Sequence, residues 1–410
     1  MSRKKIKVKM SHIMIFVFIL LVIIASVATI YVATSLAELP INLPFKPASI
    51  EPMEISRESQ SIMDQWYNRQ IYEPDKVVDI SNITDESRLN LEPITRDKFK
   101  EQFRFIDIDS LDLYIEENGG LKDSNNFAGL IVDKADKLNT ATGIKAVNGT
   151  DDVITVDTVN GITIIGKTIG TADNSVKAKV IIVNDASKVL TECVKDLNEY
   201  LTIDKLYDEA EAILAINASE YSYTKGNSQA VISGAYKYNG RDISKASSDE
   251  NIVNITESGN LSIGNSTEGA YNSVKCDTLL IKNGENIYNN TEDTERNAIT
   301  AIGNTEKGEI IFVVASGGGY GSGIGATNTE VLQVFNEYGA VNAAVVSGGT
   351  KTIVYWNNRV ITDNAEPFGV ELPNAFIVKA YVKEDSDTDS ESASNETVAE
   401  EQTENTENNK

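Results

Sequence analysis

The sequence predicts an α+β domain, a mixed and β-rich sheet with packed helices, preceded by one transmembrane helix. Three observations support this prediction. An uncharged apolar run follows a basic N-terminus, β-branched runs recur between residues 156 and 383, and only two segments of that region have clear helical spacing. Strands that outnumber helices, in irregular order along the chain, are typical of α+β domains.

Composition narrows the classes of function. The 410 residues include 37 Lys and Arg against 61 Asp and Glu, a net charge of −24, so we expect no nucleic-acid partner. The single histidine, His12, excludes Ser-His-Asp and Cys-His catalytic systems and imidazole-based zinc sites. Cys193 and Cys276 are predicted to be buried free thiols, with a disulfide between them as the alternative.

The N-terminal segment has the features of a membrane anchor. Residues 1–11 are basic, and the apolar run Ile13–Val32 is long enough for about 30 Å of helix, the thickness of a bilayer core. We predict a single transmembrane helix over residues 12–36, with the basic tail in the cytoplasm and the rest of the chain outside the cell membrane. A cleaved signal peptide is the alternative, although its apolar region would normally span only about 7–15 residues.

The segments that flank the main domain are less informative. Residues 37–155 are predicted to be an extracytoplasmic spacer or accessory region, because prolines cluster near its start and Glu54–Tyr72 has the spacing of an amphipathic helix. Residues 384–410 are highly acidic and almost free of apolar side chains, so they cannot bury enough surface to offset the entropy of ordering. We predict a disordered acidic tail there.

The elements of the main domain, residues 156–383, follow from local patterns. Apolar residues at helical spacing predict helices over Ile203–Leu214 and Thr329–Tyr338. Runs rich in β-branched residues predict strands, namely Gly161–Ile165, Val176–Val183, Ala235–Tyr238, Leu261–Ile263, Thr278–Ile281, Glu309–Ala315, Ala343–Val346, Ile353–Tyr355 and Ala375–Val382.

A glycine-rich segment follows the strand predicted at Glu309–Ala315. Gly321, Gly323 and Ala326 match the dinucleotide-binding pattern G-x-G-x-x-A, but the next predicted strand leads into Ser-Gly-Gly and lacks the carboxylate that would hold a ribose. We therefore predict no cofactor and assign no metal ligands. A strand, a flexible loop and a helix N-terminus in this order favour an anion or sugar site, because backbone amides converge there.

Several motifs occur in a fixed order through this region. They are Ala215-Ile216-Asn217, then Arg296-Asn297-Ala298-Ile299-Thr300-Ala301-Ile302-Gly303, Gly325-Ala326-Thr327 with Glu330, Tyr338-Gly339-Ala340-Val341-Asn342-Ala343, and Ser347-Gly348-Gly349. The order resembles the phosphodiester glycosidase family, whose bacterial members carry A-I-N-G-G-x-F, R-N-P-R-T-A-I-G, G-A-T-x-x-E-L, Y-G-A-x-N-A and L-D-G-G. The resemblance implies a domain that hydrolyses or binds glycosyl phosphodiesters of surface glycans.

The resemblance also implies site residues. The candidate catalytic residues are Asn217, Arg296 and Glu330, and the candidate substrate-binding residues are Gly325, Thr327, Asn342, Ser347, Gly348 and Gly349. Two charged groups of the family motifs are replaced, since Ile299 stands at the second Arg of R-N-P-R and Ser347 at the Asp of D-G-G. An Arg offers paired donors to a phosphate and a carboxylate can act as acid or base, whereas Ile and Ser supply neither function.

Two main functions follow as alternatives. The protein is either a membrane-anchored phosphodiester glycosidase or a catalytically inactive relative that binds a glycan or a partner in the cell envelope. A purely structural envelope protein is a third alternative. The expected partners are a carbohydrate or glycosyl phosphodiester and, through residues 12–36, the membrane. Convergence of Asn217, Arg296, Glu330 and Ser347 on one cleft would favour an enzyme.

Overall fold

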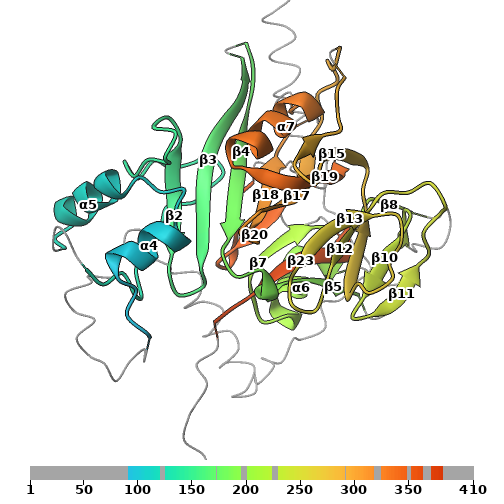
Figure 1. Ribbon diagram of the computed structural model, residues 1–410, viewed down its shortest axis with the longest axis horizontal. Coiled ribbons are helices and arrows are strands. Elements are labelled where there is room, and N and C mark those ends of the chain that lie inside the picture. The colour runs from blue at the N-terminus through green and yellow to red at the C-terminus, as the bar shows by residue number, and fades with distance from the viewer. Residues whose placement is uncertain are drawn as a thin grey trace, which may run out of the picture. The chain divides into compact units, whose positions relative to one another are not determined.

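The computed structural model describes residues 91–120, 125–171, 173–194, 201–223, 230–290, 292–317, 325–348, 352–362 and 371–381. The predicted transmembrane helix, the helix expected at Glu54–Tyr72 and the acidic tail lie outside these residues. Within them, no helix combines the length and the apolarity that crossing a bilayer requires. The described part has many strands and four α-helices. This confirms a β-rich domain with packed helices (Figure 1).

The largest element is a nine-stranded sheet with the strand order β1-β2-β3-β4-β18-β17-β19-β15-β16. Its pairings are all antiparallel, so the sheet is antiparallel and not mixed as the sequence predicted. The reason is local, because short turns join consecutive strands such as β2, β3 and β4, and short turns connect antiparallel neighbours. The strands are β1 (Ile131–Asp133), β2 (Asp152–Asp157), β3 (Ile162–Thr171), β4 (Asn174–Val183), β15 (Thr278–Lys282), β16 (Glu285–Asn286), β17 (Ile299–Thr305), β18 (Ile310–Ala315) and β19 (Ala340–Gly348).

Both faces of this sheet are buried, and β18 shows how the sequence achieves this. Phe312 and Val314 belong to one hydrophobic core, whereas Ile311 and Val313 belong to another. Successive side chains of a strand point to opposite faces, so a strand covered on both sides has a continuous apolar sequence.

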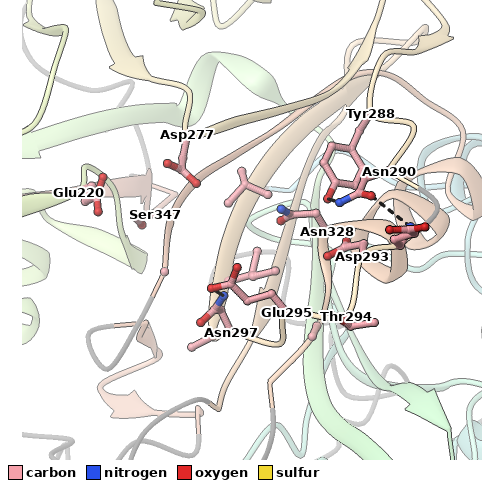
Figure 2. Close-up of a pocket in the computed structure, with 16 residues that line it drawn as sticks. Glu220, Asp277, Tyr288, Asn290, Asp293, Thr294, Glu295, Asn297, Asn328 and Ser347 are labelled. Carbon is pink, nitrogen blue, oxygen red and sulfur yellow. Dashed lines mark hydrogen bonds between the residues drawn. The ribbon is translucent and has the colours of Figure 1, made fainter.

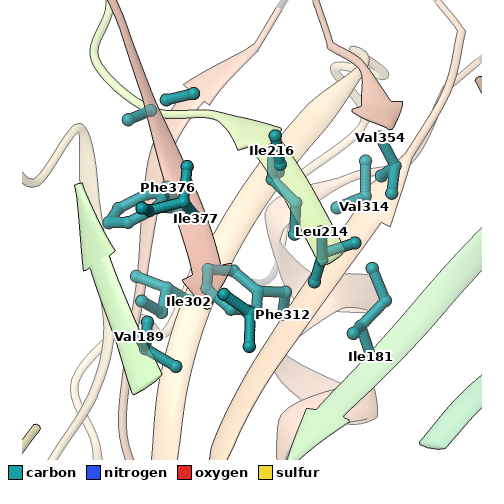
Figure 3. Packing of buried hydrophobic residues seen from close by; sticks show 14 of the residues in the cluster. Ile181, Val189, Leu214, Ile216, Ile302, Phe312, Val314, Val354, Phe376 and Ile377 are labelled. Atoms are coloured by element: carbon teal, nitrogen blue, oxygen red, sulfur yellow. The ribbon is translucent and has the colours of Figure 1, made fainter. Parts of the chain in front are cut away.

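The first core lies between the nine-stranded sheet and a five-stranded sheet of order β21-β20-β7-β23-β5. Figure 3 shows Phe312 of β18 near Phe376 of β23, with ring centroids 5.4 Å apart. Cys193 and Cys276 are both free and buried in this core, which confirms the prediction of two thiols. The strands of this sheet are β5 (Val189–Cys193), β7 (Ala212–Asn217), β20 (Val354–Trp356), β21 (Arg359–Val360) and β23 (Asn374–Lys379).

The helix predicted over Ile203–Leu214 is shorter than expected. Helix α6 spans Ile203–Glu209, Glu211 has a positive φ of 51°, and β7 begins at Ala212. Strand β7 pairs with β20 and β23, so the sheet determines the conformation of residues whose local spacing suggested a helix.

A second core lies on the other face of the nine-stranded sheet, against helices α4 (Arg96–Gln102), α5 (Ile108–Glu117) and α7 (Asn328–Glu337). Phe99 of α4 and Phe335 of α7 are almost fully buried there. Because β1 and β2 belong to the same sheet, the domain boundary predicted at residue 156 falls inside β2. Residues 96–157 thus contribute two helices and two strands to this fold.

A second five-stranded sheet, of order β11-β10-β14-β12-β13, extends the first core through Tyr236, Val253 and Val274. Two further pairs of short strands, β6 with β22 and β8 with β9, complete the sheets of the described residues. Their bounds are β6 (Leu201–Thr202), β8 (Tyr221–Tyr223), β9 (Ala230–Ile232), β10 (Tyr236–Tyr238), β11 (Arg241–Ser244), β12 (Ile252–Ile255), β13 (Leu261–Gly264), β14 (Asn272–Lys275) and β22 (Glu371–Leu372).

Candidate functional site

A hollow of about 520 Å³ lies at the end of the nine-stranded sheet where β17 begins and β19 ends. Ile299 and Ser347 both line it. These two residues lie on neighbouring strands, because Ile299 pairs with Gly348 and Thr300 pairs with Ser347. The two positions that lack the charged residues of the family motifs therefore both lie at this hollow.

Carboxylates and amides dominate the walls of this hollow. Figure 2 shows Glu220 and Asp277 on the side of Ser347, with Tyr288 and Asn328 opposite. No described residue that lines the hollow is a Lys, Arg or His. The acidic residues of the lining, called here the five carboxylates, are Glu220, Asp277, Glu292, Asp293 and Glu295.

Asp277 has its place fixed by the sheet. It directly precedes β15, and its backbone N–H donates to the carbonyl of Val345 on β19 at 2.8 Å. Its carboxylate accepts one long hydrogen bond, from the Thr278 hydroxyl at 3.4 Å, and the residue is exposed. Asp277 therefore presents a solvated carboxylate one strand away from the position where the family motif has its Asp.

Asn217 ends β7 and is only 2% exposed. Its amide nitrogen donates to the Ser347 hydroxyl at 2.8 Å. Its carbonyl oxygen accepts from the Thr300 hydroxyl and from the Ile353 backbone N–H, each at 2.9 Å. Since these bonds use both polar atoms of the side chain, Asn217 positions Ser347 and joins three segments beneath the hollow.

Arg296 and Glu330 form a separate pair beside the hollow and do not line it. The Arg296 Nη1 donates to Glu330 Oε1 at 2.8 Å, and the Arg296 Nε donates to the carbonyl of Gly325 at 3.1 Å. The Arg296 Nη2 is buried without a partner among the described residues. Glu330 thus neutralises the Arg296 guanidinium.

The N-terminus of α7 is occupied by side chains of the protein. Thr327 and Glu330 form a capping box, in which each side chain accepts the backbone N–H of the other residue. The backbone N–H of Thr329 donates to Asp293 at 2.8 Å. Carboxylates are favourable near the positive end of a helix, and the backbone N–H groups of Thr327, Thr329 and Glu330 already have partners there.

The predicted substrate-binding residues have different places in the structure. Gly348 lines the hollow, and a Cβ on it would lie 2.4 Å from the Ala298 carbonyl oxygen. Gly325 has a φ of +73°, and a Cβ on it would lie 2.4 Å from the Asn297 backbone, so this glycine permits a close contact of two segments. Gly349 lies outside the described residues.

Asn342 lies away from the hollow. It is five residues from Ser347 on β19, which corresponds to about 17 Å along a strand. Its side chain donates to Asn304 and accepts from the backbone N–H of Asn283. These contacts fix the opposite end of the sheet. The structure thus brings Asn217, Ser347 and Gly348 together, and places Arg296, Glu330, Gly325 and Thr327 in an adjoining cluster.

The sequence analysis missed the five carboxylates. The positions of two of them in the sequence could have suggested a place near the site. Glu220 occupies the variable position of the A-I-N-G-G-x-F motif, and Glu295 directly precedes Arg296. The place of Asp277 beside Ser347 depends on the pairing of β15 with β19, which no local pattern indicates.

Comparison with known families supports the resemblance seen in the motifs. Residues 210–379 match the family model described as phosphodiester glycosidase. The resemblance to this family is confirmed. The matched segment includes β7, β15, β17 and β19, and with them the walls of the hollow. Comparison with curated proteins gives no match.

Comparison with solved structures gives matches of low sequence identity, among them the following two. A hypothetical protein from Synechocystis has 14% sequence identity and a TM-score of 0.46, and the match covers 57% of this chain and 65% of that one, less than two thirds of its length. The catalytic domain of zebrafish N-acetylglucosamine-1-phosphodiester alpha-N-acetylglucosaminidase, auto-inhibited by its pro-peptide, has 14% identity and a TM-score of 0.44, with coverage of 54% and 83%.

Proposed function

We propose that the protein is a carbohydrate-binding relative of the phosphodiester glycosidases that does not hydrolyse glycosyl phosphodiesters by the usual route of the family. We further propose that residues 12–36 anchor it in the cell membrane and that the domain of residues 91–381 faces outward. The second part rests on the sequence, which has a basic flank before a long apolar run.

The observation that supports the first part is the charge of the hollow. A phosphodiester is an anion, and its binding needs nearby cations or free amides. Ile299 replaces the arginine of the family motif at the wall, and Arg296 is paired with Glu330. The five carboxylates would repel a phosphodiester in the absence of a compensating cation.

The remaining lining suits a sugar. Carboxylates and asparagine amides accept from and donate to sugar hydroxyls, and the ring of Tyr288 offers an apolar face. A few polar groups that converge on a concave surface are typical of small-ligand sites. A volume of about 520 Å³ is within the usual range of such sites, about 300–1,000 Å³.

Two measurements on the purified full-length protein test this function. Calorimetric titration with a panel of oligosaccharides should give saturable binding, and a glycosyl phosphodiester should release no sugar above the level of heat-denatured protein. Ser347→Ala should weaken the binding, whereas Glu306→Gln, in the exposed turn after β17, should leave it unchanged. Release of sugar that disappears in Ser347→Ala, or a panel without any saturable binding, would refute the proposal.

A further inference from the structure

We infer that the side chains of Lys179 and Asn139 are joined by an intramolecular amide bond. The bond ties the segment between β1 and β2 to strand β4, and it is independent of the proposed function. Two features support it: the contact of a buried amine with an amide carbonyl, and a cradle on the sheet that holds the asparagine in place.

Lys179 lies in the buried part of β4. The residue is only 2% exposed, and its Nζ donates to the Oδ1 of Asn139 and to the backbone carbonyl of Asp136. Val314, which pairs with Lys179, and Ile181, two positions further along β4, belong to the first core (Figure 3). The amine therefore meets the Asn139 amide at the edge of an apolar core. Burial of an ammonium group there is costly, and conversion of the amine to an amide removes its charge.

The sheet forms a cradle for the Asn139 side chain. Gly166 of β3 lies directly opposite Lys179 in the pairing of β3 with β4. A Cβ on Gly166 would lie 2.8 Å from the Asn139 Cβ and 3.0 Å from its Cγ, so the asparagine occupies the space that this glycine leaves free. The Asn139 Nδ2 donates to the backbone carbonyl of Ala178 at 3.3 Å. The amide group is thus held beside Lys179 through its nitrogen as well as its oxygen.

A turn stabilised by Asp136 presents Asn139 to this cradle. The Asp136 carboxylate accepts from the Leu138 backbone N–H at 2.7 Å. It also accepts from the backbone N–H and the hydroxyl of Thr140. Asn139, between these two residues, has a φ of +57°, a left-handed conformation that asparagine adopts more readily than most residues. The turn therefore places a carboxylate in the same short segment as the amide that reacts.

The reaction needs no group from outside the protein. The Lys179 Nζ attacks the Asn139 Cγ with its lone pair, the Nζ–Cγ bond forms and the Cγ–Nδ2 bond breaks. One proton passes from Nζ to Nδ2, which leaves as ammonia, so nothing is oxidised or reduced. Asp136, whose carbonyl contacts Nζ, provides the carboxylate that carries this proton. Two groups held in contact react as if they were present at a very high concentration.

Peptide mapping of the full-length protein tests for the bond, with a simple hydrogen bond as the competing interpretation. Trypsin cleaves after unmodified lysine, so a chain without the bond gives residues 138–145 and 180–188 as separate peptides. The bonded chain gives one branched peptide instead, in which residues 138–145 are joined to residues 178–188 and cleavage after Lys179 is blocked. Its mass should lie about 17 Da, the mass of ammonia, below the sum of its two parts.

Variants identify the reacting groups. Lys179→Arg retains the positive charge and Asn139→Ala removes the amide, and neither should give the branched peptide. Asn139→Asp should still give it, now with loss of water, about 18 Da, because a carboxylic acid can replace the amide. Asp136→Asn keeps an acceptor for the turn but cannot take up the proton, and should lower the branched fraction at least about tenfold. Lys177→Arg, at an exposed position of the same strand, is the matched control and should retain the bond.

The decisive measurement uses the wild-type chain, so it does not depend on whether a variant folds. Wild-type protein that gives only the linear peptides would overturn the inference, because a hydrogen bond alone would then join the two side chains. A branched peptide that persists in Lys179→Arg would overturn it as well. Complete bonding in Asp136→Asn would overturn the assignment of the proton carrier.

Discussion

Replacement of Asn217 by alanine tests whether this residue organises the site or takes part in chemistry. The side chain is 2% exposed and its carbonyl oxygen accepts from the Ile353 N–H and the Thr300 hydroxyl, two groups that are themselves fully buried. Asn217→Ala leaves both donors without a partner. An unsatisfied buried donor costs about 1–3 kcal/mol, and the hydroxyl can rotate whereas the backbone N–H cannot.

We therefore expect Asn217→Ala to lower the free energy of unfolding by about 3–5 kcal/mol, which includes the small cavity left by the amide. Ser347→Ala orphans only the Asn217 amide nitrogen and should cost about 1–2 kcal/mol. Urea unfolding of the full-length protein, followed by tryptophan fluorescence, measures both values. Trp356 is fully buried on β20, the strand that pairs with β7, and therefore reports on this region.

Asn260→Ala provides the control, because Asn260 lies exposed in the turn between β12 and β13, and its loss should change stability by less than about 0.5 kcal/mol. A loss of less than about 1 kcal/mol in Asn217→Ala, similar to that of the control, would refute the structural role. Asn217 would then have to be considered again as a residue that contacts the ligand.

Two further predictions concern the domain and its buried thiols. A chain that begins at residue 210 lacks β4, the strand that pairs with β18 from Ile310 to Ala315. We therefore expect residues 210–379 alone to show no cooperative unfolding by circular dichroism, whereas residues 91–381 should unfold cooperatively. A sharp transition in the shorter chain would contradict the fold described. Burial raises the pKa of the Cys276 thiol to about 12 and that of Cys193 to about 11, above the unfolded values. Because the folded pKa is the higher one, their contribution to stability is complete below about pH 8.5 and declines as the pH rises toward 11. Urea midpoints from pH 8 to 10.5 should fall more steeply in the wild type than in Cys276→Ala, and parallel curves would disprove this effect.

Part of the strands of the main domain could be predicted from sequence because of their burial, whereas strands such as β5, β12, β14 and β17 were not predicted. Strand β18 and the second half of β4, Val180–Val183, are covered on both faces, so their residues are all apolar and most are β-branched, a signal that is independent of their partners. The end of α6 could not be predicted, because Ala212–Asn217 is also apolar at helical spacing and only its pairing with β20 and β23 makes it a strand. Strands β1 and β2 could not be predicted either, because their short apolar runs are strands only through their pairing in the nine-stranded sheet.

The candidate site likewise combines residues that could be identified from the sequence with residues that only the structure reveals. Asn217 and Ser347 were identified because the family motifs mark them, and the structure brings them within hydrogen-bonding distance. Arg296 and Glu330 were identified in the same way, yet they neutralise each other, and Glu330 also forms the capping box of α7 with Thr327. Asp277 has no motif, and its relevance arises only because β15 lies beside β19.

By itself, the sequence determined the chemistry available to this protein: its strong negative charge, its lack of catalytic histidine, its apolar N-terminal run and the loss of two charged groups from the family motifs. The tertiary structure decided where that chemistry acts. Ile299 and Ser347 are 48 positions apart, and their common hollow exists because β17 and β19 pair in register. Composition can be read from the whole chain and local spacing from neighbouring residues. This site, in contrast, is produced by the pairing of strands that are far apart in the sequence.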